Sequence, residues 1–295
     1  MTQTPKRASN SHAVESPPSW CAAAWHVCCV LGQQQMESGR AVETVGQKKL
    51  AVDIEGDGEA VVFLHGLGST SSVWEPQAMA LRGKFKVIRC DLEGAGRSPL
   101  AGPLSIESWV ADLAALLDKH GIARARFVGH SLGTLILQHF AVLHPERVLK
   151  LALIGVNRAP PEARRVAVRE RVAKVRAEGL PSIAAAIIKG GLSPYTFASK
   201  PEIVGFVREL LLRQSTEGYA ACCEAMAASN AADIAKIACP VMVIAGEDDA
   251  ISPPANGSAF AAELANGTYK AIAKCGHWQP IEQPAALNAI LEEFL

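Results

Sequence analysis

The serine at position 131 has the surroundings of a catalytic nucleophile. The segment Gly129-His130-Ser131-Leu132-Gly133 follows an apolar run and opens a stretch with helical spacing. In such a tight strand-to-helix turn the central serine is strained, its hydroxyl is exposed, and its neighbours must be small. The start of the helix also favours the negative charge that develops during attack on a carbonyl. We therefore predict that Ser131 is the nucleophile.

A serine hydroxyl becomes reactive when a base removes its proton and a carboxylate orients that base. The best candidate base is His277, which follows the last predicted strand in a Gly-His-Trp segment. Three acids, Glu247, Asp248 and Asp249, follow a predicted strand at 241–245, and their spacing alone does not choose among them. Less suitable histidines lie in a glycine turn, beside the serine, or along and at the ends of helices: His65, His130, His120, His139 and His144.

Backbone amides are the predicted donors to the negative oxygen of a tetrahedral intermediate. One is the N–H of Leu132, directly after the nucleophile. The other is the N–H of Leu67, in the glycine turn His65-Gly66-Leu67-Gly68 after a short apolar strand. Together with the serine, the histidine and one of the acids, these donors would complete an acyl-transfer site.

Alternating strands and helices must position these residues. Strands are predicted at 48–54, 60–64, 85–90, 125–128, 148–156, 241–245 and 269–273, and the main helices follow Ser105 or lie at 132–144, 255–265 and 284–294. This order predicts an α/β fold with a mostly parallel central sheet and helices on both faces. Ligands of such sheets bind beyond the carboxyl ends of the strands, where each candidate above is found.

A long helical interval interrupts the alternation before the last two strands. Helices are predicted at 161–178, 183–189, 201–213 and 218–228. An insertion at this point would lie over the strand ends as a lid that excludes water and shapes the pocket. We therefore expect a first core part at 36–157, a helical lid at 158–235 and a second core part at 236–295.

The first 35 residues are predicted to be a disordered extension, or the result of a start codon assigned too early, with Met36 as the true start. A short apolar run at 20–31 is too short to span a bilayer. Lys6 and Arg7 precede it, but they lie far away and prolines intervene, so a signal peptide is the less favoured alternative.

The overall composition limits the classes of binding partner that we expect. Hydrophobic residues make up 49% of the 295 residues, and 29 basic side chains balance 29 acidic ones. This balance suggests neither a nucleic acid nor a membrane partner. The eight cysteines include no C-x-x-C pair and no zinc-ligand spacing, so we expect a reduced, cytoplasmic protein without metal or cofactor. The sequence leaves the oligomeric state open.

The ordered set of motifs resembles the α/β-hydrolase superfamily over about residues 46–295. Its members are His65-Gly66-Leu67-Gly68, Asp91 to Ser98, Gly129 to Gly133, Gly246-Glu247-Asp248-Asp249 and Gly276-His277. In the family pattern the acid is the third residue after the glycine, which implies Asp249. Haloalkane dehalogenases and epoxide hydrolases carry an aspartate where this chain has Ser131, so those reactions are not expected.

Within the superfamily, the segments 73–77, 218–226 and 231–233 look like those of 3-oxoadipate enol-lactonases. The resemblance implies hydrolysis of a small carboxylic ester or lactone, similar to 3-oxoadipate enol-lactone. The usual Arg-Trp-Phe stretch of the lid is replaced near 189–193, and 91–96 differs from the usual Arg-Gly-His-Gly. Trp278 after the histidine is more like the hydrolases that break C–C bonds of meta-cleavage products. That activity, a cofactor-free perhydrolase and a ligand-binding receptor are the alternatives.

The substrate pocket is expected to be partly apolar. Trp278, Tyr195, Met226 and Phe197 are the predicted lining residues, although each could instead pack in the core. A substrate with a carboxylate would also need a cation in the pocket. The candidates are the arginines of the lid and its borders: Arg158, Arg164, Arg165, Arg169 and Arg213.

Overall fold

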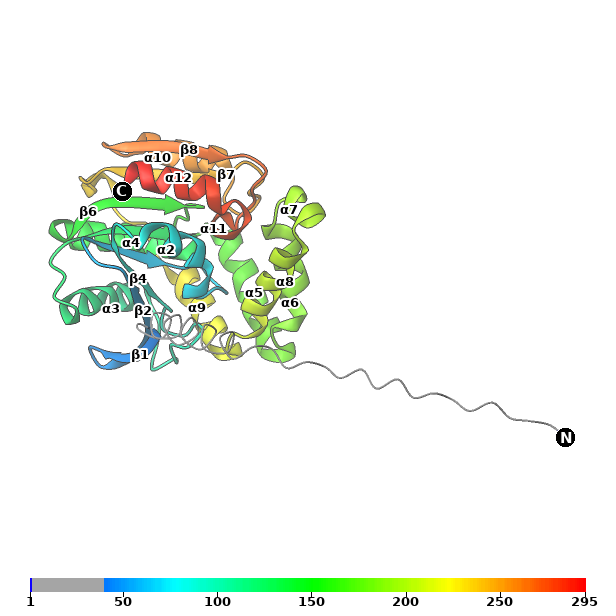
Figure 1. Cartoon of the computed structure of the whole chain (residues 1–295). Coiled ribbons are helices and arrows are strands. Elements are labelled where there is room, and N and C mark those ends of the chain that lie inside the picture. Colours follow the sequence, from blue (N-terminus) through cyan, green and yellow to red (C-terminus); the bar gives the residue numbers. More distant parts are fainter. Residues whose placement is uncertain (2–39) are drawn as a thin grey trace. The chain divides into compact units, whose positions relative to one another are not determined.

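A computed structural model describes residue 1 and residues 40–295 of the chain (Figure 1). Its centre is an eight-stranded sheet in the order β1-β2-β4-β3-β5-β6-β7-β8. The strands are β1 (Arg40–Val45), β2 (Lys48–Glu55), β3 (Ala60–Leu64), β4 (Lys86–Cys90), β5 (Ala125–His130), β6 (Val148–Ile154), β7 (Val241–Gly246) and β8 (Gly267–Ile272). From β4 onward all neighbouring strands are parallel, whereas β2 is antiparallel to both β1 and β4. The predicted mostly parallel sheet is confirmed.

The central strands are continuous apolar runs because both of their faces are covered. All five side chains of β3 and all six residues of β7 are buried. The edge strand β1 was not predicted from the sequence. Its Val42 is 52% exposed, so the alternation that identifies a half-buried strand is weak there.

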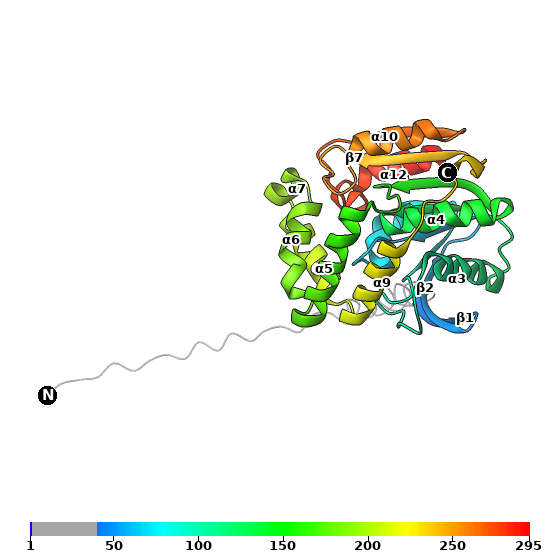
Figure 2. The same ribbon diagram turned by 180° about the vertical axis from the view of Figure 1, so that it is seen from behind.

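Helices cover the sheet on two sides. Figure 1 and Figure 2 show α2 (Glu75–Leu81) and α12 (Pro284–Phe294) on one face, with α3 (Ile106–Lys119), α4 (Leu132–Leu143) and α10 (Pro254–Glu263) on the other. Helix α3 begins as predicted at Ser105, which forms a capping box with Ser108. Its buried face includes Trp109 and Leu113, and each such side chain contributes roughly 1.5–3 kcal/mol on burial.

The helical lid lies between β6 and β7, before the last two strands. It contains α5 (Glu162–Glu178), α6 (Pro181–Gly191), α7 (Pro194–Ser199), α8 (Pro201–Leu212) and α9 (Thr216–Ala228). Helix α5 packs against α6 and α9, and α6 packs against α8. The short helices α7 and α11 (Gln279–Glu282), the latter just after His277, were not predicted from the sequence. Single helical turns also form at η1 (Ser71–Trp74), η2 (Pro145–Arg147) and η3 (Ile234–Lys236).

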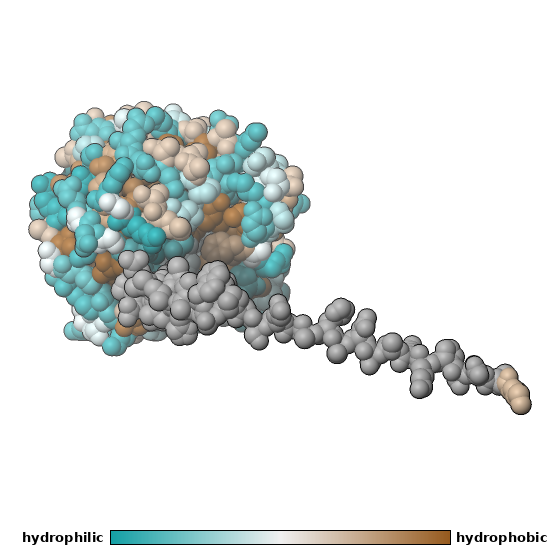
Figure 3. All heavy atoms as spheres, in the orientation of Figure 1, coloured by the Kyte–Doolittle hydropathy of each residue, from teal (hydrophilic) through white to brown (hydrophobic). Residues whose placement is uncertain are grey.

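Some predictions made for the whole chain extend to residues that the structure does not describe. The predictions for residues 1–35, including the apolar run and the alternative start at Met36, lie outside the described residues. Within residues 40–295, the five cysteines are free, and no helix is both long and apolar enough to cross a lipid bilayer. Hydrophilic side chains cover most of the face in Figure 3, and the apolar ones lie in small groups.

Candidate active site

Ser131 lies in the turn that joins β5 to α4, and its backbone is strained. Its φ of 50° and ψ of −112° are unusual for a residue with a side chain. A Cβ at Gly133 would lie 2.5 Å from the carbonyl oxygen of Leu64, and one at Gly129 would lie 2.7 Å from a methyl carbon of Leu137. The two flanking glycines therefore let the turn close against the sheet, as the sequence pattern requires.

His277 and Asp249 form a buried pair at the carboxyl edge of the sheet. His277 Nδ1 lies 2.8 Å from Asp249 Oδ2. The carboxylate also accepts hydrogen bonds from the backbone amides of Ile251 and Ser252 and from the side-chain amide of Gln279. Burial alone would raise the pKa of Asp249, but His277 and the two backbone amides outweigh it, and the pKa is lowered. Asp249 is therefore held as a carboxylate, the form that can orient and support an imidazolium.

The neighbouring acids do not share this position. The side chains of Glu247 and Asp248 are exposed, whereas Asp249 is only 2% exposed. The geometry thus separates three acids that spacing alone could not separate.

Asn157, which the sequence analysis missed, is the hydrogen-bond partner of the serine. Its Nδ2 lies 3.4 Å from Ser131 Oγ, and the described residues include no hydrogen bond between Ser131 and His277. Thr134 Oγ1 accepts from the backbone N–H of Asn157, and Gln138 donates to its carbonyl. Catalytic hydrogen bonds often tighten only when substrate is bound. The available signal was the place of Asn157 in the loop that follows the parallel strand β6.

The predicted oxyanion donors border the same site. Neither the N–H of Leu67 nor that of Leu132 donates a hydrogen bond to another described residue. The turn before Leu67 is fixed by His65, whose Nδ1 lies 2.8 Å from the carbonyl oxygen of Gly66 and whose Nε2 accepts from the amide of Leu92. A Cβ at Gly66 would lie 3.0 Å from that of Ser131, so the two loops approach closely.

His130 supports the candidate base through the backbone. Its Nε2–H donates to the carbonyl oxygen of His277 at 2.6 Å. Burial lowers the pKa of His130 to about 3, with a further contribution from the nearby His277, so the ring is neutral at physiological pH. This is a structural role, in keeping with its exclusion as the base.

The loop that carries His277 is bonded to the helical lid. The backbone N–H of His277 donates to the carbonyl oxygen of Gly191, at the end of α6, at 2.7 Å. Glu282 is fully buried and accepts from the amides of Trp278 and Ser193 and from the hydroxyl of Thr196. The lid therefore positions the loop that carries His277 as well as covering it.

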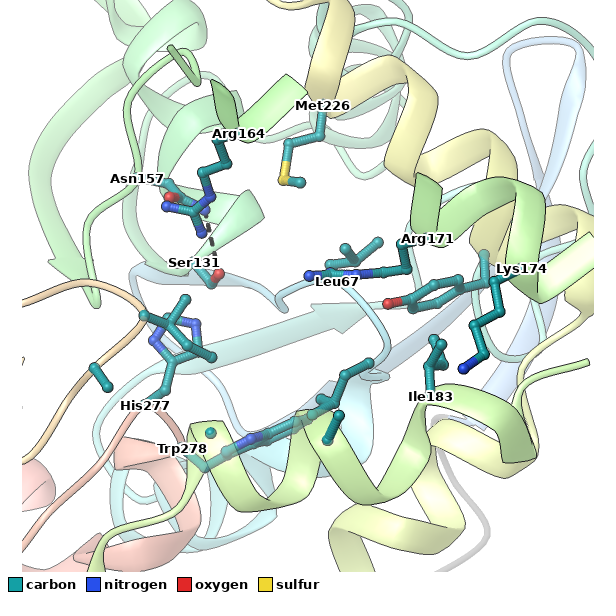
Figure 4. Close-up of a pocket in the computed structure, with 16 residues that line it drawn as sticks. Leu67, Ser131, Asn157, Arg164, Arg171, Lys174, Ile183, Met226, His277 and Trp278 are labelled. Atoms are coloured by element: carbon teal, nitrogen blue, oxygen red, sulfur yellow. Dashed lines mark hydrogen bonds between the residues drawn. The ribbon is translucent and has the colours of Figure 1, made fainter. Parts of the chain in front are cut away.

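A cavity of about 570 Å³ contains Ser131 and His277 in its wall (Figure 4). Leu67, Ile183, Met226 and Trp278 give it apolar surface, so two of the predicted lining residues, Met226 and Trp278, are found there. This catalytic cavity joins loops of the sheet to the inner side of the lid.

Tyr195 and Phe197 were predicted to line the pocket, and the structure contradicts this. Both belong to α7, are 40% and 42% exposed, and do not line the catalytic cavity. Tyr195 instead contacts the ammonium groups of Lys200 and Lys274. The unpredicted helix α7 is the reason, because it turns these rings outward. The tyrosine in the cavity wall is Tyr219.

Three cations on one side of α5 enter the catalytic cavity: Arg164, Arg171 and Lys174. Their separations of seven and three residues place them on a common helix face. Figure 4 shows Arg164 beside Asn157 and Ser131, with Arg171 and Lys174 farther along the helix. Burial and the neighbouring Arg171 lower the pKa of Arg164, whereas Asp249 acts in the opposite direction. No acidic side chain is among the residues that line this cavity.

Only Arg164 among the five predicted arginines lines the catalytic cavity. The other four have partners elsewhere: Arg158 pairs with Glu263, Arg169 with Glu162 and Arg213 with Glu209, and Arg165 donates to the carbonyls of Ala227 and Ser229. Arg171 and Lys174 were missed, although their spacing from Arg164 was available as a signal. Within the described residues, no group of three or more His, Cys, Asp or Glu is placed to hold a metal ion.

Comparison with known proteins places this site in a family. A model of the alpha/beta hydrolase family matches residues 61–290. The chain is 33% identical to 3-oxoadipate enol-lactonase 2 of Acinetobacter baylyi over 243 residues, which cover 82% of this chain and 90% of that protein. The resemblance to enol-lactonases is thereby confirmed.

Solved structures agree with the sequence comparison. A thermophilic esterase from Thermogutta terrifontis, determined with malate bound, superposes with a TM-score of 0.81 at 28% identity, covering 86% of this chain and 96% of that one. The enol-lactonase of Burkholderia xenovorans LB400 gives a TM-score of 0.80 at 29% identity, covering 85% and 98%. The chain described here belongs to the alpha/beta hydrolase family.

Proposed function

We propose that this protein is a serine hydrolase that cleaves a small carboxylic ester or lactone, with Ser131, His277 and Asp249 as its catalytic residues. The observation that carries the proposal is a strained serine in the wall of the same cavity as a buried, hydrogen-bonded histidine–aspartate pair. Relatives named as an esterase and as enol-lactonases support the same class of substrate.

The reaction proceeds in two steps. Ser131 Oγ attacks the carbonyl carbon while His277 takes its proton, and the N–H groups of Leu67 and Leu132 stabilise the resulting oxyanion. The bond from that carbon to the leaving oxygen then breaks, and His277 gives the proton to this oxygen. In the second step His277 removes a proton from water, the hydroxide attacks the acyl-serine, and Ser131 regains its proton as the acid leaves. Asp249 holds His277 in the required tautomer throughout.

The cations of α5 indicate that the substrate carries a carboxylate. Arg171 and Lys174 lie about 10 and 15 Å along the helix axis from Arg164, at 1.5 Å per residue. An acyl group whose carbonyl lies at Ser131 could therefore extend a carboxylate toward these two side chains. A lactone of the 3-oxoadipate enol-lactone type has such a carboxylate, and its enol product relaxes to a ketone, which makes ring opening irreversible. Malate, bound by the related esterase, is also a carboxylate.

The test is the steady-state loss of enol-lactone ultraviolet absorbance in the wild type and in Ser131→Ala. We expect the variant to lose about 10⁴-fold or more in kcat, because the nucleophile acts as a unit with its base. Ser72→Ala is the matched control, since Ser72 is exposed and lies outside the catalytic cavity.

Two outcomes would contradict the proposal in different ways. Full activity in Ser131→Ala would show that Ser131 is not the nucleophile. The folded wild type could instead hydrolyse simple esters and leave the enol-lactone unchanged. The enol-lactone would then be wrong as the substrate, and the serine mechanism would still hold. Activity confined to vinylogous 1,5-diketones would favour the C–C hydrolases, for which Trp278 in the cavity wall is the supporting observation.

A further inference from the structure

A second cavity, of about 400 Å³, adjoins the catalytic cavity and shares three wall residues with it: Asn157, Arg164 and Ile251. We call it the side cavity. The rest of its wall comes from residues that follow β6, from Ser252 and from α10, which contributes Asn256, Ala259 and Glu263. The two spaces are thus separated by side chains that also touch the reacting region.

The side cavity lies on the flank of Ser131 where the base is found. Asn157 donates to Ser131 Oγ, and a Cβ at Gly155, two residues earlier, would lie 3.2 Å from the His277 ring. Ile251 and Ser252 follow Asp249 and bind its carboxylate with their amides. Figure 4 shows Arg171 and Lys174 at the other end of the catalytic cavity from Asn157 and Arg164. In acyl transfer the leaving oxygen takes its proton from the base, so the leaving group must lie on this flank.

The wall of the side cavity contains polar groups without a protein partner. Ser252 Oγ is buried and has no hydrogen-bond partner within the described residues. Arg164 forms no ion pair there, whereas Arg158 is paired with Glu263 at 2.6 Å and lies over the ring of Phe260. One uncompensated positive charge, that of Arg164, therefore remains in the same wall as the unpartnered hydroxyl of Ser252. A buried hydroxyl and a guanidinium are suitable donors to a carboxylate.

On the basis of the proposed function, we propose that the side cavity binds the leaving group of an acyclic ester, an alcohol that itself carries a carboxylate. Arg164 and Ser252 would hold the carboxylate while His277 protonates the departing alcohol oxygen. A lactone needs no such site, because its leaving oxygen stays attached to the acyl group. The side cavity therefore extends the substrate range from lactones to esters of hydroxy acids.

The test uses three propanoyl esters, those of methanol, 2-pentanol and 3-hydroxybutanoate. The last two alcohols have similar shapes, and only the last carries a carboxylate. We expect the wild type to give the highest kcat/KM with the 3-hydroxybutanoate ester. Ala259→Phe, which fills the side cavity, is expected to lower the kcat/KM ratio of this ester to the methyl ester by about tenfold or more. Ala262→Phe, exposed on the same helix and outside both cavities, should keep the wild-type ratio.

The methyl ester keeps this proposal separate from the proposed function. If the wild type hydrolyses the methyl ester through Ser131 but prefers the 2-pentyl ester, or if Ala259→Phe leaves the ratio unchanged, the leaving-group site is wrong and the serine hydrolase stands. If no ester is cleaved in a Ser131-dependent way, both proposals fall. Ser252→Ala provides a second measurement, with an expected fall in the kcat/KM ratio of the 3-hydroxybutanoate ester to the 2-pentyl ester.

Discussion

The loops of the sheet and the helical lid contribute to one cavity in different ways. In the loops, hydrogen bonds fix the side chains of the candidate triad, as the four that converge on the carboxylate of Asp249 illustrate. In the lid, Arg164, Arg171 and Lys174 line the cavity without an ion pair to any described residue, although Arg171 also contacts the hydroxyl of Tyr219. From this difference we infer that the loop residues take part in the reaction itself, whereas the lid cations can bind a charged part of the substrate. Substitutions of the candidate triad should therefore affect all substrates, whereas substitutions of the lid cations should affect only some substrates.

After Ser131→Ala, the largest effect is expected from Asp249→Asn. The amide would hold His277 in the wrong tautomer, so kcat should fall about 10³- to 10⁴-fold for every ester, charged or neutral. Asp248→Asn is the matched control, because that side chain is exposed and outside the cavity. Steady-state kinetics with both classes of ester measure the effect. A loss restricted to charged esters would break the proposed division between loops and lid.

A smaller and selective effect is expected from Arg171→Gln in the lid. The ratio of kcat/KM for monomethyl adipate to that for methyl heptanoate should fall about 10- to 100-fold, since a charge-assisted hydrogen bond contributes roughly 1.5–3 kcal/mol. Arg169→Gln removes an exposed charge from the same helix and should keep the wild-type ratio. Equal losses for both esters would show that Arg171 acts on folding or chemistry instead of selectivity.

Gly276→Ala probes the contact between the two regions. The new Cβ would lie 2.6 Å from the carbonyl oxygen of Gly191 and from the amide of Ser193, so the loop and the lid must separate. We expect the free energy of unfolding to fall by about 2 kcal/mol, as overpacked sites do. Urea unfolding measures this, with Gly205→Ala, where the space is open, as the control. Unchanged stability would mean that lid and loop are coupled only weakly.

The smallest effect at neutral pH is expected from His130→Gln, which keeps a donor for the carbonyl of His277. Folded His130 has a pKa of about 3, whereas the unfolded residue binds a proton near pH 6.5. The unfolded state of the wild type therefore gains protons as the pH falls. The free energy of unfolding of the wild type should then decline, relative to that of the variant, by about 1.4 kcal/mol per pH unit below pH 6.5. Urea unfolding at pH 7 and pH 5 tests this, with His144→Gln as the control. If the difference in free energy of unfolding between the two proteins is the same at pH 7 and pH 5, burial does not lower the pKa of His130.

The same contrast explains what the sequence could predict. Glycine spacing identifies a turn that only small residues allow, so Ser131 and its strand and helix were predictable from local sterics. His277 followed from its place after a strand, and Asp249 needed the family pattern. The orientation of Tyr195 and the cluster of Arg164, Arg171 and Lys174 were not predicted, because they depend on how amphipathic helices pack together. Asn157 was missed since no repeated spacing marks a single residue after a strand.

The hydrogen bond from the N–H of His277 to Gly191 has a consequence for the diversity of the family. In this chain, a lid that is bonded to the loop of the proposed base is not an independent module that could be exchanged by itself. A chimaera that receives a foreign lid would also need the donor's residues 276–282, including the counterpart of Glu282, to keep its histidine in place. New substrate ranges should therefore arise more readily from point changes on the inner face of α5 than from replacement of whole lids.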